Sequence, residues 1–160
     1  MTSILKVDNL QDASGTGSPY IKDHVLQVKT ATDSTERTTT STSFETRGNT
    51  LAVSITPKST LSKILVTCSL SYGTPSGTVS LFLTLFRDST NLGDVTKGFG
   101  NLFDGSNYHY GHTSLQILDA PSTTSTIIYQ PYFRIGSGSN DGRINNTGAF
   151  STITAMEIGG

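Results

Sequence analysis

LAVSITPKSTLSKILVTCSLSY, residues 51–72, carries the clearest strand pattern in this chain. Over residues 64–72 every second residue, from Ile64 to Tyr72, is apolar, and the residues between them are one leucine, one threonine and two serines. A period of two over this run predicts a strand with one buried face, formed by Ile64, Val66, Cys68, Leu70 and Tyr72. Residues 51–55 repeat the alternation, and Pro57 ends them because proline lacks the N–H that a sheet needs. The stretch therefore predicts two strands with a polar connection, and an all-β domain around them.

The composition fits a β-protein with a small core. The chain has 160 residues, the size of a single domain, and 34% of them are hydrophobic. Threonine and serine are the two commonest residue types, and threonine favours strands over helices. Because a small core is often completed by oligomerisation, the composition favours an assembly of several copies.

Charge and hydropathy argue against several classes of protein. The net charge is −1 and no stripe of lysine and arginine is present, so we expect no nucleic-acid partner. The sequence contains no run of about 18 apolar residues, so we expect no membrane-spanning segment. The first residues lack the apolar segment of a signal peptide. Cys68 is the single cysteine and cannot form an intrachain disulfide; on the buried face of a strand it acts as a small hydrophobe.

Further strands are predicted on both sides of this stretch. Apolar patterning marks them at residues 20–30, where Val25, Leu26 and Val28 suit a first strand, and at 78–88, 113–120, 125–135 and 150–158. The threonine-rich residues 30–43 read as an edge strand or a long surface hairpin. The glycine-rich residues 88–111 and 136–148 read as loops. About eight core strands without a helix predict a single jelly-roll β-sandwich, whose last strand lies inside its sheet with Ile153, Met156 and Ile158.

The predicted strand at 78–88 is apolar on both faces. Val79, Leu81, Leu83 and Leu85 form one face, and Phe82 and Phe86 lie on the other. Such a strand has to be covered on both sides, either by the second sheet and a long loop or by a neighbouring subunit. We favour the subunit, which makes Phe82 and Phe86 the predicted interface of a homotrimer.

Several short runs resemble the signature of one family of phage proteins. Residues 54–66, SITPKSTLSKILV, are similar to a recurring run of small, tail-fibre-like bacteriophage virion proteins. Similar runs follow in the expected order: LFRD at 85–88, LDAP at 118–121 with STTST after it, and ITAMEIGG at 153–160. The opening, ILKVDNLQDASG at 4–15, also resembles theirs. The resemblance implies a trimeric jelly roll of the tumour-necrosis-factor type, made in the host cytoplasm and located in the virion.

Residues 1–22 are predicted to lie outside the domain, which comprises residues 23–160. A few apolar side chains are followed by the glycine- and proline-containing residues 13–19, which break regular structure. One interpretation is a frayed terminus. The resemblance favours the other, an extended attachment arm that becomes ordered against another virion protein. The predicted anchoring residues are Ile4, Leu5, Val7 and Leu10.

A host-binding surface is predicted in the loop at 99–112. Aromatic faces stack on sugar rings, and amides and carboxylates bond to sugar hydroxyls. The predicted receptor-binding residues for a host surface polysaccharide are Asp104, Asn107, Tyr108 and Tyr110. A second loop carries the same residue types, namely Asn140, Asp141, Arg143, Asn145 and Asn146. The alternative for the two tyrosines is packing on the trimer seam.

No pattern predicts an enzyme or a cofactor. Twelve acidic residues offer many pairs, but none stands out as the two spaced carboxylates of a glycosidase. No Gly-x-Ser-x-Gly elbow precedes a helix. His109 and His112 could hold a metal ion if three copies met on a trimer axis, whereas loop histidines are more often solvated, so no metal is predicted.

The sequence therefore predicts a bacteriophage virion structural protein. It would be a trimeric short fibre or surface-displayed module, anchored by its N-terminal arm and binding host surface glycans. The alternative is a capsid decoration or cement protein with no receptor role, and a third hypothesis is a carbohydrate-degrading enzyme.

Overall fold

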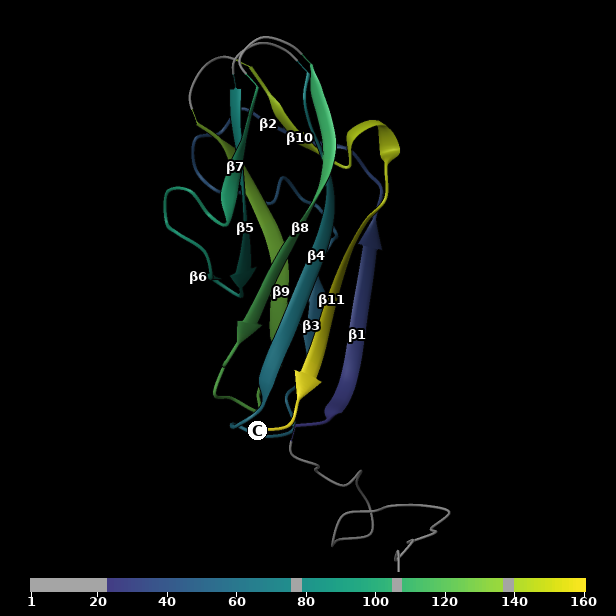
Figure 1. Ribbon diagram of the computed structural model, residues 1–160, viewed down its shortest axis with the longest axis vertical. Helices are drawn as coiled ribbons and strands as arrows, with labels where there is room; N and C mark the ends of the chain where they lie inside the picture. The colour runs from purple at the N-terminus through teal and green to yellow at the C-terminus, as the bar shows by residue number, and fades with distance from the viewer. Residues whose placement is uncertain (1–22, 76–78, 105–107, 137–139) are drawn as a thin grey trace, which may run out of the picture.

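The computed structural model describes residues 23–75, 79–104, 108–136 and 140–160, which form two antiparallel sheets packed face to face (Figure 1). Sheet A contains β1 (Val25–Asp33), β11 (Ser151–Ile158), β4 (Lys63–Thr74) and β8 (His109–Asp119), with the short β10 (Gly142–Ile144) and β2 (Arg37–Thr39). Sheet B contains β3 (Val53–Ile55), β9 (Ile127–Ile135), β5 (Val79–Arg87), β6 (Thr90–Asn91) and β7 (Gly100–Asp104). A 3-10 turn, Asn146–Gly148, lies between β10 and β11, and no helix in these ranges could cross a membrane.

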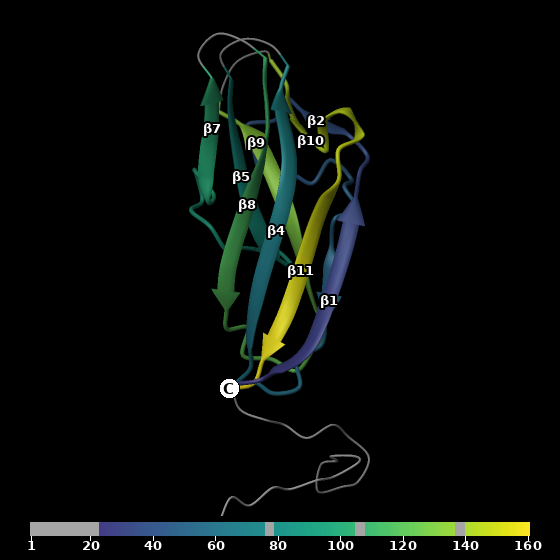
Figure 2. The same ribbon diagram turned by 45° about the vertical axis from the view of Figure 1, so that its right-hand side comes forward.

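The pairing of the eight main strands is that of a jelly roll. Sheet A has the order β1-β11-β4-β8, and sheet B has the order β3-β9-β5-β7. Counted along the chain, the first of these strands pairs with the eighth, the second with the seventh, the third with the sixth and the fourth with the fifth. This nesting defines the jelly roll and confirms the predicted fold. The last strand, β11, lies between β1 and β4, as predicted (Figure 2).

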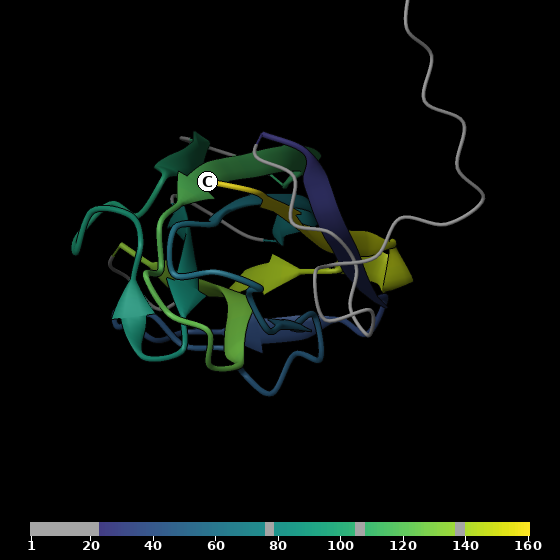
Figure 3. The same ribbon diagram turned by 90° about the horizontal axis from the view of Figure 1, so that it is seen from below.

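Both ends of the described chain meet at one end of the sandwich, which we call the proximal end. The N–H of Asp23 donates to the carbonyl of Gly159 at 2.7 Å, beside the C-terminus (Figure 3). The opposite end, where β4 finishes and β8 begins, is the distal end (Figure 1). Asp23, the first described residue, therefore lies at the proximal end.

The stretch at 51–72 forms two strands, but they belong to different sheets. β3 pairs with β9 in sheet B, whereas β4 pairs with β11 and β8 in sheet A. All five predicted inward residues of β4 are buried, and they meet the inward side chains of β5 and β9 in one core. Each fully buried leucine, isoleucine or phenylalanine contributes about 1.5–3 kcal/mol. Burial also raises the pKa of the Cys68 thiol, which keeps it an inert thiol.

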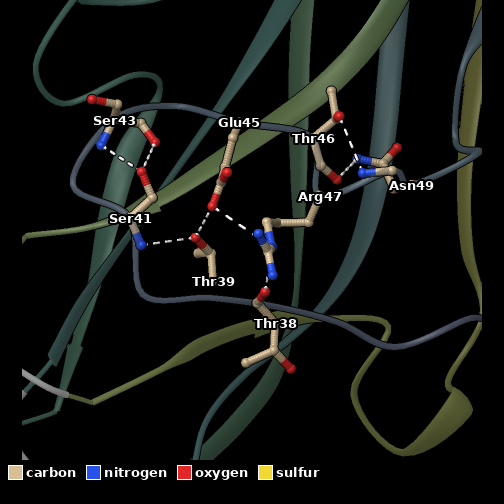
Figure 4. Close-up of polar contacts among 9 residues, drawn as sticks. Thr38, Thr39, Ser41, Ser43, Glu45, Thr46, Arg47 and Asn49 are labelled. Atoms are coloured by element: carbon tan, nitrogen blue, oxygen red, sulfur yellow. Dashed lines mark hydrogen bonds and ion pairs between the residues drawn. The ribbon is translucent and has the colours of Figure 1, made fainter.

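The threonine-rich segment at 30–43 is held by its own side chains (Figure 4). Its first residues extend β1 to Asp33, an edge strand as predicted, and residues 37–39 form β2. At the end of β2, the Thr39 hydroxyl donates to the Glu45 carboxylate and accepts from the N–H of Ser41 at 2.9 Å. Arg47 donates from Nε to the Thr38 carbonyl at 2.9 Å. Side-chain hydroxyl groups thus form hydrogen bonds with backbone N–H groups that are not paired between strands.

Two predicted loops contain strands, and these predictions were wrong. β6, β7 and the start of β8 lie within residues 88–111, and β10 lies within 136–148. Periodicity failed here because β7 contains few apolar residues, while β6 and β10 are very short. In β11 the inward face is Ser151, Ile153, Ala155 and Glu157, so Met156 and Ile158 point outward instead of joining Ile153.

Four of the runs that carry the family resemblance lie in the described part of the chain, and they make contacts with one another at the proximal end. Arg87 of LFRD donates to both oxygens of Asp119 of LDAP, at 2.9 and 2.8 Å, and Tyr129 donates to the same carboxylate at 2.6 Å. Glu157 of the C-terminal run is fully buried and accepts from the N–H of Lys58, in the run at 54–66, at 2.6 Å. Charge-assisted bonds of this kind join the two sheets where the chain enters the domain. Partly buried polar contacts therefore connect these runs in the fold.

Candidate assembly face and distal recognition surface

The outward face of sheet A carries an apolar row that crosses all four main strands. The strand register places Val28 opposite Met156, Met156 opposite Leu65, and Leu65 opposite Leu118. Val28 and Leu118, at the two ends of the row, are 54% and 51% exposed, and the two middle residues are half-buried. Directly opposed side chains on one face of a sheet touch, so the row is a continuous apolar strip.

Toward the distal end the same face becomes hydroxyl-rich and stays almost free of charge. The next two rows are Thr30, Thr154, Thr67 and Gln116, then Thr32, Thr152, Ser69 and Ser114. Among the outward positions of β1, β11, β4 and β8, all of which are described, Lys63 is the single lysine, arginine, aspartate or glutamate. Solvent-facing sheet surfaces normally carry charges. This face therefore has the chemistry of a surface that is covered.

The outward face of sheet B is partly covered by its own chain. The guanidinium of Arg134 lies 4.2 Å from the ring centre of Phe82 and 5.2 Å from that of Phe44. Phe86 stacks on Tyr132 with ring centres 4.0 Å apart. Both Phe82 and Phe86 are half-buried through contacts within one chain. Their assignment to a trimer interface stays a prediction, and sheet A presents the longer apolar row.

Tyr108 and Tyr110, two of the predicted receptor-binding residues, lie side by side at the distal end. Their rings stack with centres 6.4 Å apart, and they are 69% and 50% exposed. Tyr110 lies over Gly73: a Cβ added to that glycine would come within 2.7 Å of the Tyr110 ring. Gly73 therefore leaves a notch in sheet A that seats the ring. Asp104 is the last residue of β7, but its side chain and all of Asn107 lie outside the described residues.

A charged cluster from the second predicted loop borders these tyrosines. The register places Arg143 on the far side of Gly73 from Tyr110, in one row across the sheet. Arg143 is bonded to Asp141 at 3.0 Å and to Glu36 at 3.1 Å. Burial lowers the pKa of Arg143, but the bonds to Asp141 and the charge of Glu36 outweigh it, so the pKa is raised. One cation faces two carboxylates, which leaves the cluster a net charge of about −1 at neutral pH.

The fold brings together two segments that lie far apart in the sequence. Tyr110 and Arg143 share a row because β8 and β10 both pair with β4. Asn146 also reaches the Gly73 notch; it is buried, and its Oδ1 has no hydrogen-bond partner in the described ranges. Sequence reasoning missed Glu36, since nothing in a threonine-rich segment signals contact with a loop near the other end of the chain.

The two histidines of β8 point in opposite directions. His109 faces inward and stacks on Tyr72, with its Nε2 3.2 Å from the tyrosine oxygen. His112 faces outward beside Ser69, 3.4 Å from the hydroxyl. Residues at i and i+3 of a strand lie on opposite faces, so the two imidazoles cannot share one ion. No group of three histidine, cysteine or acidic residues that could bind a metal occurs in the described part of the chain.

The predicted anchoring residues Ile4, Leu5, Val7 and Leu10 lie outside the described residues.

Comparison with known proteins adds little to this geometry. No family model and no curated protein matches the chain. One similar solved structure is the D431N mutant VP2 protein of infectious bursal disease virus, from derived T=1 particles. The two sequences are 12% identical, the match covers 96% of this chain and 40% of that chain, and the TM-score is 0.39. Another is the structure of the Gx strain of that virus, which is 14% identical in sequence. This match covers 98% of this chain and 43% of that chain, and the TM-score is 0.36. The chain spans about two fifths of either, and likeness at this level carries no conclusion about what the chain does.

Proposed function

We propose that this protein is a bacteriophage virion structural module that assembles as a homotrimer through the outward face of sheet A. The observation that carries the proposal is the apolar row Val28–Met156–Leu65–Leu118, on a face whose four main strands carry one charged residue among their outward positions. The resemblance of the sequence to small phage virion proteins, and its jelly-roll topology, supply the rest of the support.

The lack of charge favours a partner that is another copy of the same chain. In a symmetric assembly, equivalent residues approach one another around the axis. A charge near that axis would meet its own copies, and like charges in contact are costly. Hydroxyl groups can donate and accept, so rows of threonine and serine can pair with themselves.

The projected area of the face is smaller than the area that such an assembly needs. Four strands about 4.8 Å apart and about nine residues long give a projected area of roughly 500–600 Å². The accessible area of a surface covered in side chains is larger than its projection, and stable interfaces need about 800 Å² from each partner. A trimer gives every subunit two contacts, so residues at the edges of the face would have to add to the area that each contact buries.

Attachment and display follow from the two ends of the sandwich. The chain enters at the proximal end, so an arm formed by residues 1–22 would join the module to the particle there. The distal end then faces outward and presents Tyr108 and Tyr110 beside Arg143, Asp141 and Glu36. Aromatic rings next to hydrogen-bonding side chains suit a host surface glycan, which makes receptor binding the role of this end.

Two measurements on phage particles test the proposal. Mass spectrometry of purified virions should find the chain as a stoichiometric component, and its absence would refute a virion role. Purified protein should compete with the phage for adsorption to host cells. If the chain is in the particle but does not compete, the decoration or cement role without a receptor replaces the receptor role.

A further inference from the structure

One long strand edge of sheet A carries none of the usual protection against pairing. β8 is eleven residues long and pairs with β4 in unbroken register; no strand within the described ranges pairs with its other edge. It contains no proline, lysine, arginine or bulge, and its single acidic residue, Asp119, is engaged with Arg87 at one end. Natural proteins protect such edges or use them to bind another strand.

The opposite edge of the same sheet shows what protection looks like. β1 carries Lys29 and Asp33 and has a register shift between Val25 and Gln27. The edge strands of sheet B are short instead: β3 has three residues and β7 has five. Among the described strands, β8 is thus the one long and regular edge whose single charged residue, Asp119, is engaged with Arg87 at its end.

A cleft lies directly beside this edge. It has a volume of about 340 Å³ and opens between β8 of sheet A and β7 of sheet B. Leu83 and Leu115 form a buried floor, Phe99 and Leu102 are half-buried walls, and the rim carries Asn101, Thr113, Ser114 and Gln116. None of these four polar side chains makes a hydrogen bond to another described residue.

A strand added to the free edge of β8 would use both features at once. Its backbone would pair with β8, and every second side chain would point inward over β7, into the cleft. Apolar residues at positions i and i+2 of the added strand would fit the cleft, and the residues between them would point outward and could be polar. Leu5-Lys6-Val7-Asp8 of this chain has that pattern.

We propose that the free edge of β8 and its cleft are the docking site for residues 3–8 of this chain, which add to sheet A as a further strand. The length of the chain allows it. From Asp23 the site lies about four strand spacings across the sheet and three to six residues along it, roughly 20–30 Å. The residues between Asp8 and Asp23 span up to about 50 Å when extended.

Amide hydrogen exchange of the full-length protein tests this docking. The amides of β8 that point away from β4 should exchange slowly in the wild type. Leu5→Asp with Val7→Asp should speed their exchange at least tenfold, because a carboxylate cannot enter the apolar cleft. Lys6→Asp with Asp8→Lys is the matched control: it changes the same segment at outward positions and should leave the slow exchange intact.

The outcomes are distinct. Protection that is independent of protein concentration identifies the segment of the same chain, and protection that rises with concentration identifies that of a neighbouring copy; both support the docking site. Unprotected β8 amides in the wild type, or protection that survives Leu5→Asp with Val7→Asp, would overturn it. Docking would turn Leu5 and Val7 into the cleft and leave Ile4 and Leu10 to contact another virion protein. The test uses free protein and does not depend on incorporation into particles, so the docking proposal can fail while the attachment proposal stands, and the attachment proposal can fail while the docking proposal stands.

Discussion

Replacing Leu118 by aspartate should dissociate the proposed trimer without unfolding its subunits. Leu118 is half exposed at one end of the apolar row on sheet A, opposite Leu65. Complete burial of a leucine contributes about 1.5–3 kcal/mol, so covering the exposed half contributes roughly 0.8–1.5 kcal/mol in each subunit. Three copies give roughly 2–5 kcal/mol per trimer, a loss of about 30- to 5,000-fold in association. Burying the new carboxylates adds to this cost.

The effect on the fold of the subunit itself should be small. The side chain is at the surface of one chain, and surface substitutions usually change the free energy of unfolding by about 0.5 kcal/mol. Aspartate is a poor strand residue, and the penalty reaches about 1 kcal/mol at most. The melting temperature of the dissociated chain should therefore stay within about 4 °C of its value before the change.

The assay is light scattering at micromolar concentration, with circular dichroism to follow the fold. Ile128→Asp is the matched control, since Ile128 is 44% exposed in a strand but lies on sheet B. Leu118→Asp should give folded monomers, and Ile128→Asp should keep the wild-type mass. If Leu118→Asp also keeps the wild-type mass, sheet A is not the assembly face. If only Ile128→Asp dissociates, assembly takes place through sheet B, the side on which Phe82 and Phe86 lie.

Three further predictions concern the receptor site, the arm and a buried carboxylate. Tyr108→Ala with Tyr110→Ala should abolish competition for host adsorption while the mass and melting temperature stay near wild type; surviving adsorption, or loss of the trimer, would place the receptor site elsewhere. Deleting residues 1–22 should leave a folded protein that is missing from purified particles, and normal incorporation would exclude the arm as the anchor. Burial raises the pKa of Asp33, but bonds from the N–H groups of Thr35 and Thr50, at 2.9 and 3.0 Å, outweigh this and lower it overall. Its stabilisation should then be complete above the unfolded pKa of about 4 and disappear as the pH falls through the lower folded pKa, so the cost of Asp33→Asn in chemical unfolding should be larger at pH 7 than at pH 3.

The sequence predicted the strands whose inward side chains all enter the core. β4 and β9 show unbroken alternation because both are central strands with one face buried along their whole length. β5 was also evident, including the phenylalanines on its outward face. Strands at the rim of the sandwich lacked such a signal. β7 holds a single inward leucine, and β10 is defined by its pairing with β4 and β2.

The site could be predicted only in part, for the same reason. Tyr108 and Tyr110 drew attention as aromatic residues in a polar segment, and the structure places them together. Their neighbours Arg143 and Glu36 come from distant segments, and only the shared pairing with β4 and β2 brings them near. The apolar row on sheet A was hidden because each strand contributes one residue, and its continuity depends on a register that no single segment encodes.

The mass of the full-length protein in solution decides whether the proposed assembly exists. One chain has a mass of 17.0 kDa. Light scattering coupled to size exclusion at micromolar concentration should show a single species with three times the mass of one chain. A single species with the mass of one chain, under the same conditions, would contradict the trimer, and with it the explanation of the nearly uncharged face of sheet A.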